Sequence, residues 1–166
     1  MLVVGAVLSL IVSASAEAKT AVQMSLYSLT TEEQFLNHAD DRQRGFGNNP
    51  FGNFHAPTAT TREQNNGPFP GDNAVFTFNL YTSQNRKHLV GTATFTCTYN
   101  FNKKGFCDAT YELSGGMLVG AGSIDFNAKN YTLIITGGTG KYRAVTGTVE
   151  SVQAAYSLTR LTITLT

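Results

Sequence analysis

From residue 74 to the last residue, apolar and polar side chains alternate with a period of two in one short segment after another. In the clearest segment, 89–101, one parity is mostly apolar and the other carries threonines and an asparagine. The apolar parity comprises Leu89, Ala93, Phe95, Cys97, Tyr99 and Phe101. A period of two places the two sets on opposite faces of a β-strand. A slip of one residue would exchange the buried and exposed faces, so the register is well specified.

Further segments follow the same pattern and predict strands. They are 74–81, 106–114, 117–126, 131–136, 144–154 and 157–166. Short connections rich in Gly and Asn separate them, which favours antiparallel neighbours. With a strand at 22–29 the total is eight, and eight antiparallel strands in up-and-down order close into a small barrel without exposed edges. We therefore predict an all-β fold, an eight-stranded antiparallel up-and-down β-barrel.

The region between the first two predicted strands has a different character. Thr30 and Glu33 have capping-box spacing, which predicts one or two helical turns ending at Leu36. Residues 37–73 then hold all the prolines, several glycines and several phenylalanines, without an apolar period. So long a connection in one domain is usually functional or mobile, and its aromatics argue against simple disorder. It is either a lid across a barrel mouth or an ordered surface loop.

The beginning of the chain has the features of a secretory signal. Residues 2–14 form an apolar run that ends in Ala14-Ser15-Ala16, a pattern suited to signal peptidase. The run is shorter than the roughly 20 residues that cross a bilayer. We predict a signal peptide over 1–16, with residue 18 as the alternative end, and one secreted β-barrel domain over 17–166. The usual basic residues are missing before the run, and a buried N-terminal strand is the alternative.

Secretion makes the two cysteines interpretable. Cys97 and Cys107 flank a predicted turn at 102–105, so they face each other if that turn joins antiparallel strands. A disulfide across such a short loop constrains the unfolded chain by roughly 2 to 3 kcal/mol. A metal site would need more ligands nearby, and His88 is the only histidine in this part of the sequence. We predict the disulfide and no metal.

Composition and charge exclude several classes of partner. Charged residues make up 14% of the 166 residues and the formal net charge is +1, which gives no basis for binding nucleic acid. An outer-membrane barrel would show the same alternation with inside and outside exchanged. Against that alternative, the chain has no Trp for an interfacial girdle, and charged Asp108 and Glu112 lie beside the cysteine hairpin. We expect no stable membrane insertion.

A glycine-rich corner joins two of the predicted strands. It consists of Gly137-Gly138-Thr139-Gly140 followed by Lys141. A phosphate-binding loop requires Gly-x-x-x-x-Gly-Lys-Ser/Thr at the start of a helix. Here Ile135 holds the first glycine position, Tyr142 follows the lysine, and a strand comes next. The corner is therefore a strand connection in which the glycines supply positive φ angles and close backbone approach.

The corner resembles a known family. The run ITGGTGKYRAVTG, with the approach LVGAGSIDFNAKNYTL, resembles the allene oxide cyclase and dirigent superfamily, above all its small secreted microbial members. The match covers about residues 74–152, and its sharpest part is the glycine corner with Tyr142 and Gly147. The resemblance implies an eight-stranded barrel, often a homotrimer, whose cavity takes small apolar molecules. Its members steer the ring closure of a fatty-acid epoxide or the coupling of phenoxy radicals, mainly by holding the substrate in one conformer.

This resemblance supports a functional hypothesis. The chain is a secreted dirigent-like or allene-oxide-cyclase-like barrel that binds a small apolar molecule, lipid-derived or phenolic, and steers its cyclisation or coupling. Such an isomerase-like activity involves no covalent intermediate and no cofactor. The plant active-site residues do not align onto this chain one by one, so the catalytic residues stay open. Polar residues in or beside strands provide the candidates for orienting a ligand, namely Tyr99, Tyr111, Asp125 and Arg143.

A second hypothesis is a non-catalytic secreted binding or structural module that acts through the aromatic loop 37–73. The two hypotheses predict different barrels. Steering predicts a cavity in the usual range for ligand sites, roughly 300 to 1,000 Å³, lined by aromatics and at least one inward carboxylate or arginine. The module predicts a barrel filled by its own side chains, with an apolar patch on the loop.

Overall fold

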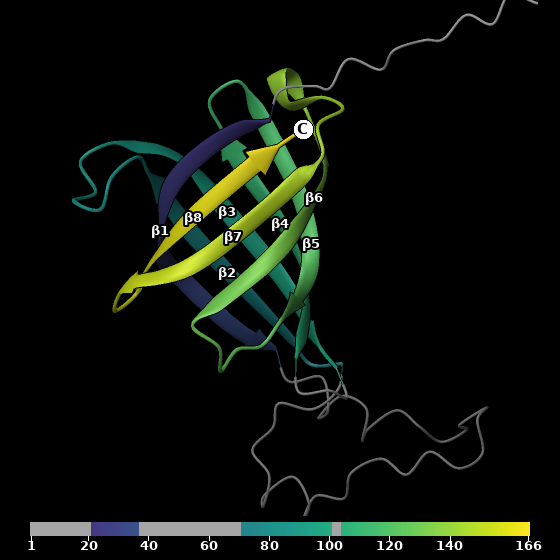
Figure 1. Cartoon of the computed structure of the whole chain (residues 1–166). Helices are drawn as coiled ribbons and strands as arrows, with labels where there is room; N and C mark the ends of the chain where they lie inside the picture. The colour runs from purple at the N-terminus through teal and green to yellow at the C-terminus, as the bar shows by residue number, and fades with distance from the viewer. Residues whose placement is uncertain (1–20, 37–70, 101–103) are drawn as a thin grey trace, which may run out of the picture.

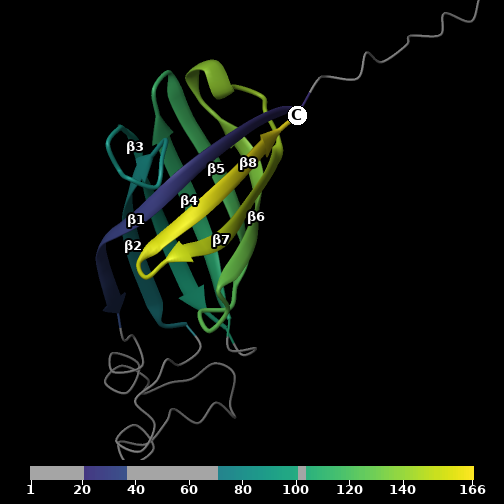
Figure 2. The same ribbon diagram turned by 60° about the vertical axis from the view of Figure 1, so that its left-hand side comes forward.

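Eight strands follow one another in the computed structural model, which describes residues 21–36, 71–100 and 104–166. Each strand pairs antiparallel with the next, and β8 returns to pair with β1, so the sheet closes (Figures 1 and 2). The strands are β1 (Val22–Leu36), β2 (Asn73–Tyr81), β3 (Leu89–Tyr99), β4 (Gly105–Leu113), β5 (Gly116–Ile124), β6 (Asn130–Gly138), β7 (Gly147–Ala155) and β8 (Leu158–Leu165). The predicted all-β, eight-stranded barrel is confirmed.

The two ends of the barrel carry different connections. We call the end where β1 begins and β8 finishes the upper end, as it appears in Figure 1. The upper connections are 82–88, 114–115 and 139–146, and the lower connections that the structure describes in full are 125–129 and 156–157. The predicted signal peptide and most of the predicted loop 37–73 lie outside the described residues. No helix in the described part of the chain is long and apolar enough to span a membrane.

The alternation within the strands sorts side chains between the interior and the surface. In β3, Ala93, Phe95 and Cys97 are buried while the threonines between them are exposed, as predicted. The prediction for Leu89 was wrong, because its side chain is 57% exposed. Leu80 pairs with Gly91 but Tyr81 pairs with Leu89, so one extra residue lies between these two positions of β3. Such a bulge changes the parity and turns Leu89 away from the interior.

The predicted helical turns before Leu36 were also wrong. β1 continues as a strand to Leu36, which pairs with Asn73 of β2. The register shifts once, between Thr30 and Glu32, and the pairing then resumes. Pairing with β2 gives the backbone N–H and C=O groups of this stretch more hydrogen-bond partners than a single helical turn would. Helices this short are also only marginally stable on their own. The tertiary pairing therefore outweighs the capping signal.

A disulfide joins β3 and β4 near the lower end. Cys97 and Cys107 are directly opposite in the ladder, their Cα atoms are 3.9 Å apart, and a disulfide bond links them. Both side chains are buried in the barrel interior. The predicted pairing is confirmed.

The glycine corner connects β6 to β7 at the upper end. It contains a single 3-10 turn, η1 (Gly140–Tyr142), and the Tyr142 side chain is only 6% exposed. The Thr139 amide donates to the Met117 carbonyl over 2.8 Å, and the Lys141 amide donates to the Gly115 carbonyl over 2.9 Å. These bonds tie the corner to the neighbouring β4–β5 connection, so two upper connections form one unit. β7 begins at Gly147 rather than at the predicted residue 144.

Candidate functional site

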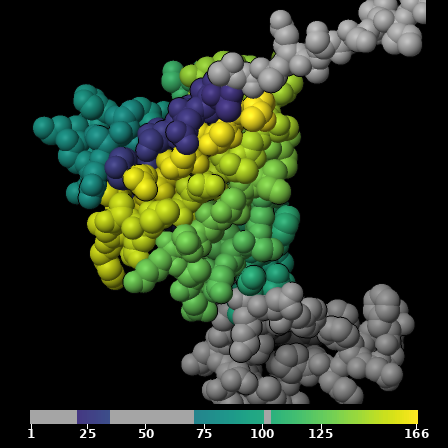
Figure 3. All heavy atoms as spheres, viewed as in Figure 1, coloured from purple at the N-terminus to yellow at the C-terminus, as the bar shows by residue number. Residues whose placement is uncertain are grey.

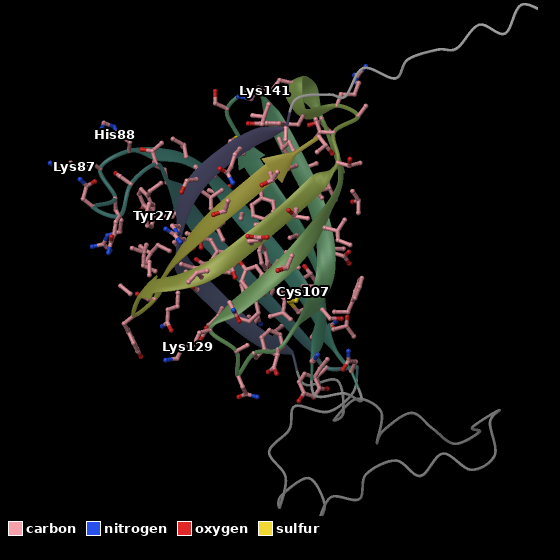
Figure 4. All side chains as sticks on the ribbon, in the orientation of Figure 1. Tyr27, Lys87, His88, Cys107, Lys129 and Lys141 are labelled. Carbon is pink, nitrogen blue, oxygen red and sulfur yellow. A yellow bond between two sulfur atoms is a disulfide. The ribbon has the colours of Figure 1, made fainter. Side chains whose placement is uncertain are left out.

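A pocket of about 360 Å³ opens at the lower mouth of the barrel. We call it the lower chamber. Its wall comes from β1, β6, β7 and β8 and from the two lower connections 125–129 and 156–157, with Lys129 on its rim (Figure 4). The lining residues are Thr30, Phe126, Asn127, Ala128, Lys129, Tyr131, Ser151, Gln153, Ala155, Ser157, Leu158 and Thr159. Its volume lies in the lower part of the range for small-molecule sites, roughly 300 to 1,000 Å³.

Behind the chamber wall, aromatic rings cluster around Phe95. The Phe95 ring centroid lies 5.0 Å from that of Phe78, 5.7 Å from that of Tyr111 and 5.9 Å from that of Tyr131. All three pairs meet edge to face, the arrangement that the ring quadrupoles favour. Tyr131 belongs both to this cluster and to the chamber lining, so it connects the open pocket to the aromatic interior.

Tyr111 carries the least satisfied polar group of this interior. Its side chain is 0% exposed, and its hydroxyl is the one buried side-chain polar atom of the described residues without a hydrogen-bond partner. Tyr111 lies further from the lower mouth than Phe95, because it pairs with Ala93 while Phe95 pairs with Ala109. A buried hydroxyl without a partner costs about 1 to 3 kcal/mol of stability. The Tyr111 hydroxyl can therefore form a hydrogen bond with a further polar group that enters the interior.

Both buried phenols stay neutral over the physiological pH range. Burial raises the pKa of the Tyr111 hydroxyl well above its usual value, and the nearby Tyr131 phenol raises it further. Burial also raises the pKa of Tyr131, an effect that a side-chain hydrogen bond with Ser151 partly offsets. The Ser151 hydroxyl in addition accepts the Tyr131 amide proton over 2.8 Å. The two phenols are thus hydrogen-bond donors and not bases.

Solved structures with this architecture are known. The chain is similar to a pyocyanin demethylase (19% identity, TM-score 0.63, 87% of this chain and 100% of the other). It is also similar to the pterocarpan synthase dirigent protein GePTS1, with 14% identity and a TM-score of 0.60. The match covers 88% of this chain and 84% of the other. A third similar structure is the Diels–Alderase AbmU from Streptomyces koyangensis, with 16% identity and a TM-score of 0.58. The match covers 88% of this chain but only 63% of AbmU, which is less than two thirds of its length. No protein-family model matches the sequence, and no curated protein matches it.

The chain has the dirigent and cyclase barrel fold. The resemblance found at the glycine corner is therefore confirmed at the level of the fold, in the closed barrel and in its strand order. At these identities the likeness extends to the fold alone, and a shared fold does not fix a reaction. The functional argument has to come from the chamber itself.

The four candidate residues fall in three different places of the dirigent-type barrel. Tyr111 lies in the interior, and Tyr99 is half-buried at the lower end of β3. Asp125 is half-buried in the connection after β5, where its carboxylate accepts the Asn127 amide proton over 2.9 Å and so shapes the turn. Arg143 is exposed at the upper end, after η1. Only Tyr111 belongs to the aromatic cluster.

Two chamber residues, Tyr131 and Ser151, were not among the candidates. Their register reveals them, since they pair directly across β6 and β7. Tyr131 has the parity of Leu133 and Ile135, which are fully buried, and this signal was present in the sequence. The expected inward carboxylate or arginine is not found among the chamber's lining residues, whose one charged member is Lys129.

The chamber therefore combines two aromatic rings and three aliphatic side chains with hydroxyl and amide groups and one lysine. Its hydroxyl donors can orient a neutral ligand through an oxygen atom, while the aromatic rings pack against its apolar part. Among the described residues, no group of three or more His, Cys, Asp or Glu side chains is placed to hold a metal ion. The arrangement suits binding and positioning of a small molecule.

The raised phenol pKa values predict a loss of stability in alkali. The unfolded chain ionises its tyrosines near about pH 10, whereas buried Tyr111 and Tyr131 keep their protons. The native state then binds more protons than the unfolded state. The contribution of the two phenols to the free energy of unfolding is therefore fully present below that pH. It is lost as the pH rises towards the native pKa values, by at most about 1.4 kcal/mol per pH unit for each phenol.

Urea unfolding at a series of alkaline pH values measures this slope. Replacing both tyrosines with phenylalanine (Tyr111→Phe, Tyr131→Phe) is expected to flatten it. The double variant Tyr27→Phe, Tyr156→Phe is the control, because Tyr27 faces out between β1 and β8 and Tyr156 is 96% exposed. An equal slope in the interior double variant and the wild type would contradict the prediction.

Proposed function

We propose that the lower chamber binds a small neutral molecule, aromatic or otherwise apolar and carrying at least one oxygen acceptor, and holds it in one conformer while it cyclises or couples. The observation that carries this proposal is a pocket lined by Phe126, Tyr131 and hydroxyl groups, next to an aromatic cluster that contains the unpartnered, fully buried Tyr111 hydroxyl. The pocket of about 360 Å³ at the barrel mouth supports this proposal. The binding-module hypothesis rests on the loop 37–73, most of which lies outside the described residues.

The chemistry of the wall selects the ligand. Phe126 and Tyr131 offer ring faces and edges, and Ser151 and Tyr131 offer hydroxyl groups. A ligand carbonyl, ether or phenol oxygen can accept a hydrogen bond from these groups and, once inside, from Tyr111. A ligand that buries its charge in the interior would lose its hydration without gaining an oppositely charged partner there, because the chamber's one charged side chain, Lys129, lies at the rim. A neutral phenolic or lipid-derived ligand is therefore favoured.

Steering requires a shaped enclosure more than a reactive side chain. Holding a flexible substrate in one conformer removes much of the entropic part of a ring-closure or coupling barrier. The closed barrel fixes the strands that form the chamber wall, so the ligand adapts to the wall. A dirigent protein and a Diels–Alderase share the fold, which supports this reaction class by analogy. Secretion of the domain remains part of the proposal and rests on the apolar run at 2–14 and the disulfide.

Binding is tested with three probes of similar size in fluorescence or calorimetric titrations. Coumarin is neutral with a carbonyl, naphthalene is neutral without an acceptor, and 1-naphthalenesulfonate is charged. Coumarin is expected to bind most tightly, and Tyr131→Phe to weaken it by about tenfold through loss of one buried hydrogen bond. Tyr156→Phe, which removes an exposed hydroxyl outside the chamber, is expected to leave binding unchanged. Equal binding of coumarin and naphthalene would reject the role given to the hydroxyl groups.

Steering is tested separately from binding. A simple para-substituted phenol is oxidised by a one-electron oxidant with and without the protein, and the ratio of coupled isomers and their enantiomeric excess are measured. Free coupling gives racemic products, and the protein is expected to shift the ratio. If coumarin binds tightly but several phenols still give racemic products, the chamber is a binding site. The steering activity would then be rejected for this substrate class.

A further inference from the structure

A second pocket lies at the upper end of the barrel, away from the lower chamber. It has a volume of about 320 Å³ and shares no lining residue with the chamber. We call it the upper pocket. β1 and β8, which run side by side on the surface (Figure 3), contribute their upper ends, and η1 and the segment after it close the other side. Its lining residues are Val22, Met24, Lys141, Tyr142, Val145, Leu165 and Thr166.

The wall of the upper pocket is almost entirely apolar. Four of its side chains, Val22, Met24, Val145 and Leu165, are aliphatic or thioether groups, and the Tyr142 ring is buried behind them. Val22 is 57% exposed, although it pairs with Leu165 at the end of the β1–β8 ladder. An alkyl chain lying in this pocket would remove this apolar surface from water, which favours binding.

One cationic side chain, that of Lys141, lies beside this apolar wall. The Lys141 amino nitrogen lies 4.9 Å from the centroid of the Tyr142 ring, and the lysine side chain runs beside Gly115 (upper end in Figure 4). Lys141 is exposed and forms no ion pair with any residue that the structure describes. Its aliphatic part can cover the pocket while its ammonium group stays at the rim.

The three upper connections carry charges of one sign, and the nearest acidic residue along the chain, Glu112, belongs to β4. The upper connections 82–88, 114–115 and 139–146 contain Arg86, Lys87, Lys141 and Arg143 and no Asp or Glu. All three connections are described, and they form this end of the barrel (Figure 1). Their summed field attracts an anionic group and repels a cationic one.

We propose that the upper pocket binds an amphipathic anion, an apolar chain with one carboxylate headgroup, with the chain against Val22, Val145 and Leu165 and the headgroup at Lys141. The site is formed in advance. The Thr166 amide donates to the Thr146 carbonyl over 2.8 Å, and the Thr146 amide donates to the Thr166 carbonyl over 3.2 Å, so the two sides of the pocket are joined. The lower chamber offers aromatic rings and hydroxyl groups in place of an aliphatic wall, so the two sites differ in their chemistry.

The test compares three probes with the same alkyl chain but different heads, in titrations followed by methyl NMR. Decanoate is anionic, decanol is neutral and decyltrimethylammonium is cationic. Decanoate is expected to bind best and to shift the methyl signals of Val22 and Val145. Lys141→Gln is expected to weaken decanoate binding by about tenfold and to leave decanol binding unchanged.

Arg143→Gln is the matched control, because it removes a cation two residues away that does not line the pocket. It is expected to weaken decanoate binding by less than about threefold, through the general field alone. Tyr131→Phe, in the lower chamber, is expected to leave decanoate binding unchanged. Equal losses for Lys141→Gln and Arg143→Gln, equal affinity for decanol and decanoate, or shifts confined to the lower chamber would each overturn the proposal.

Discussion

Replacing Gly140 with alanine is expected to lower the free energy of unfolding by about 2 to 5 kcal/mol. Gly140 has φ 58°, a left-handed conformation that side chains with a Cβ adopt at a cost. A Cβ placed there would also overlap the backbone carbonyl of Gly115, which cannot rotate away as a side chain could. That carbonyl accepts the Lys141 amide proton, so relieving the overlap breaks the contact between the two upper connections.

Gly137 provides a control within the same corner. A Cβ at Gly137 has no neighbouring heavy atom within 4 Å, and this glycine does not have a left-handed φ. Gly137→Ala is therefore expected to change the stability by less than about 1 kcal/mol. Urea unfolding of both variants and the wild type measures the difference. Similar losses for the two substitutions would show that the corner tolerates a relaxed backbone and that the Gly140 conformation is not required.

Gly140→Ala also distinguishes the two ligand sites. The substitution acts on η1, which supplies Lys141 and Tyr142 to the upper pocket, and leaves the lower connections untouched. In the folded fraction, decanoate binding is expected to fall while coumarin binding is retained. The outcome depends on the barrel being rigid enough to confine the change to one end, as a closed barrel of antiparallel strands should be.

The sequence predicted the parts of this fold that depend on local pattern. Period-two alternation defines a strand and its faces, and short connections define its neighbour, so the barrel and the Cys97–Cys107 pairing followed directly. The errors lie where pairing overrides local preference. Thr30 and Glu33 have a capping pattern, but β2 draws this stretch into the ladder. Leu89 has the right parity, but a bulge beside Gly91 turns it outwards, and the glycine was the one local signal of that bulge.

The candidate site was harder to predict than the fold. Tyr111 could be chosen because it is polar and within a strand, but the sequence does not say that its hydroxyl lacks a partner, since that depends on side chains from other strands. Tyr131 and Ser151 become neighbours only through the register of β6 and β7. The upper pocket brings together residues near both ends of the described chain with the glycine corner, a juxtaposition that exists only once β8 closes on β1.

Tyr111→Phe is expected to stabilise the ligand-free protein by about 1 kcal/mol and to weaken coumarin binding by about tenfold. The substitution removes a buried hydroxyl that has no partner, so the desolvation cost disappears while the ring contact with Phe95 remains. Most core substitutions destabilise, so a gain in stability here would be informative. It would identify a group retained at a cost to the fold, which is the pattern expected of a functional residue.

Tyr131→Phe is the matched comparison, because its side chain lines the chamber and its hydroxyl is not a buried atom without a partner. Loss of the hydroxyl's interaction with Ser151 is expected to destabilise the protein by about 0.5 to 1.5 kcal/mol, while coumarin binding weakens as in Tyr111→Phe. The two variants should thus have opposite effects on thermal stability and the same effect on binding. If Tyr111→Phe were stabilising but bound coumarin as well as the wild type, the hydroxyl would be an unsatisfied core atom and the ligand would stop at Tyr131. If it were destabilising, a buried water must already satisfy the hydroxyl, and the ligand would have to displace that water to reach it.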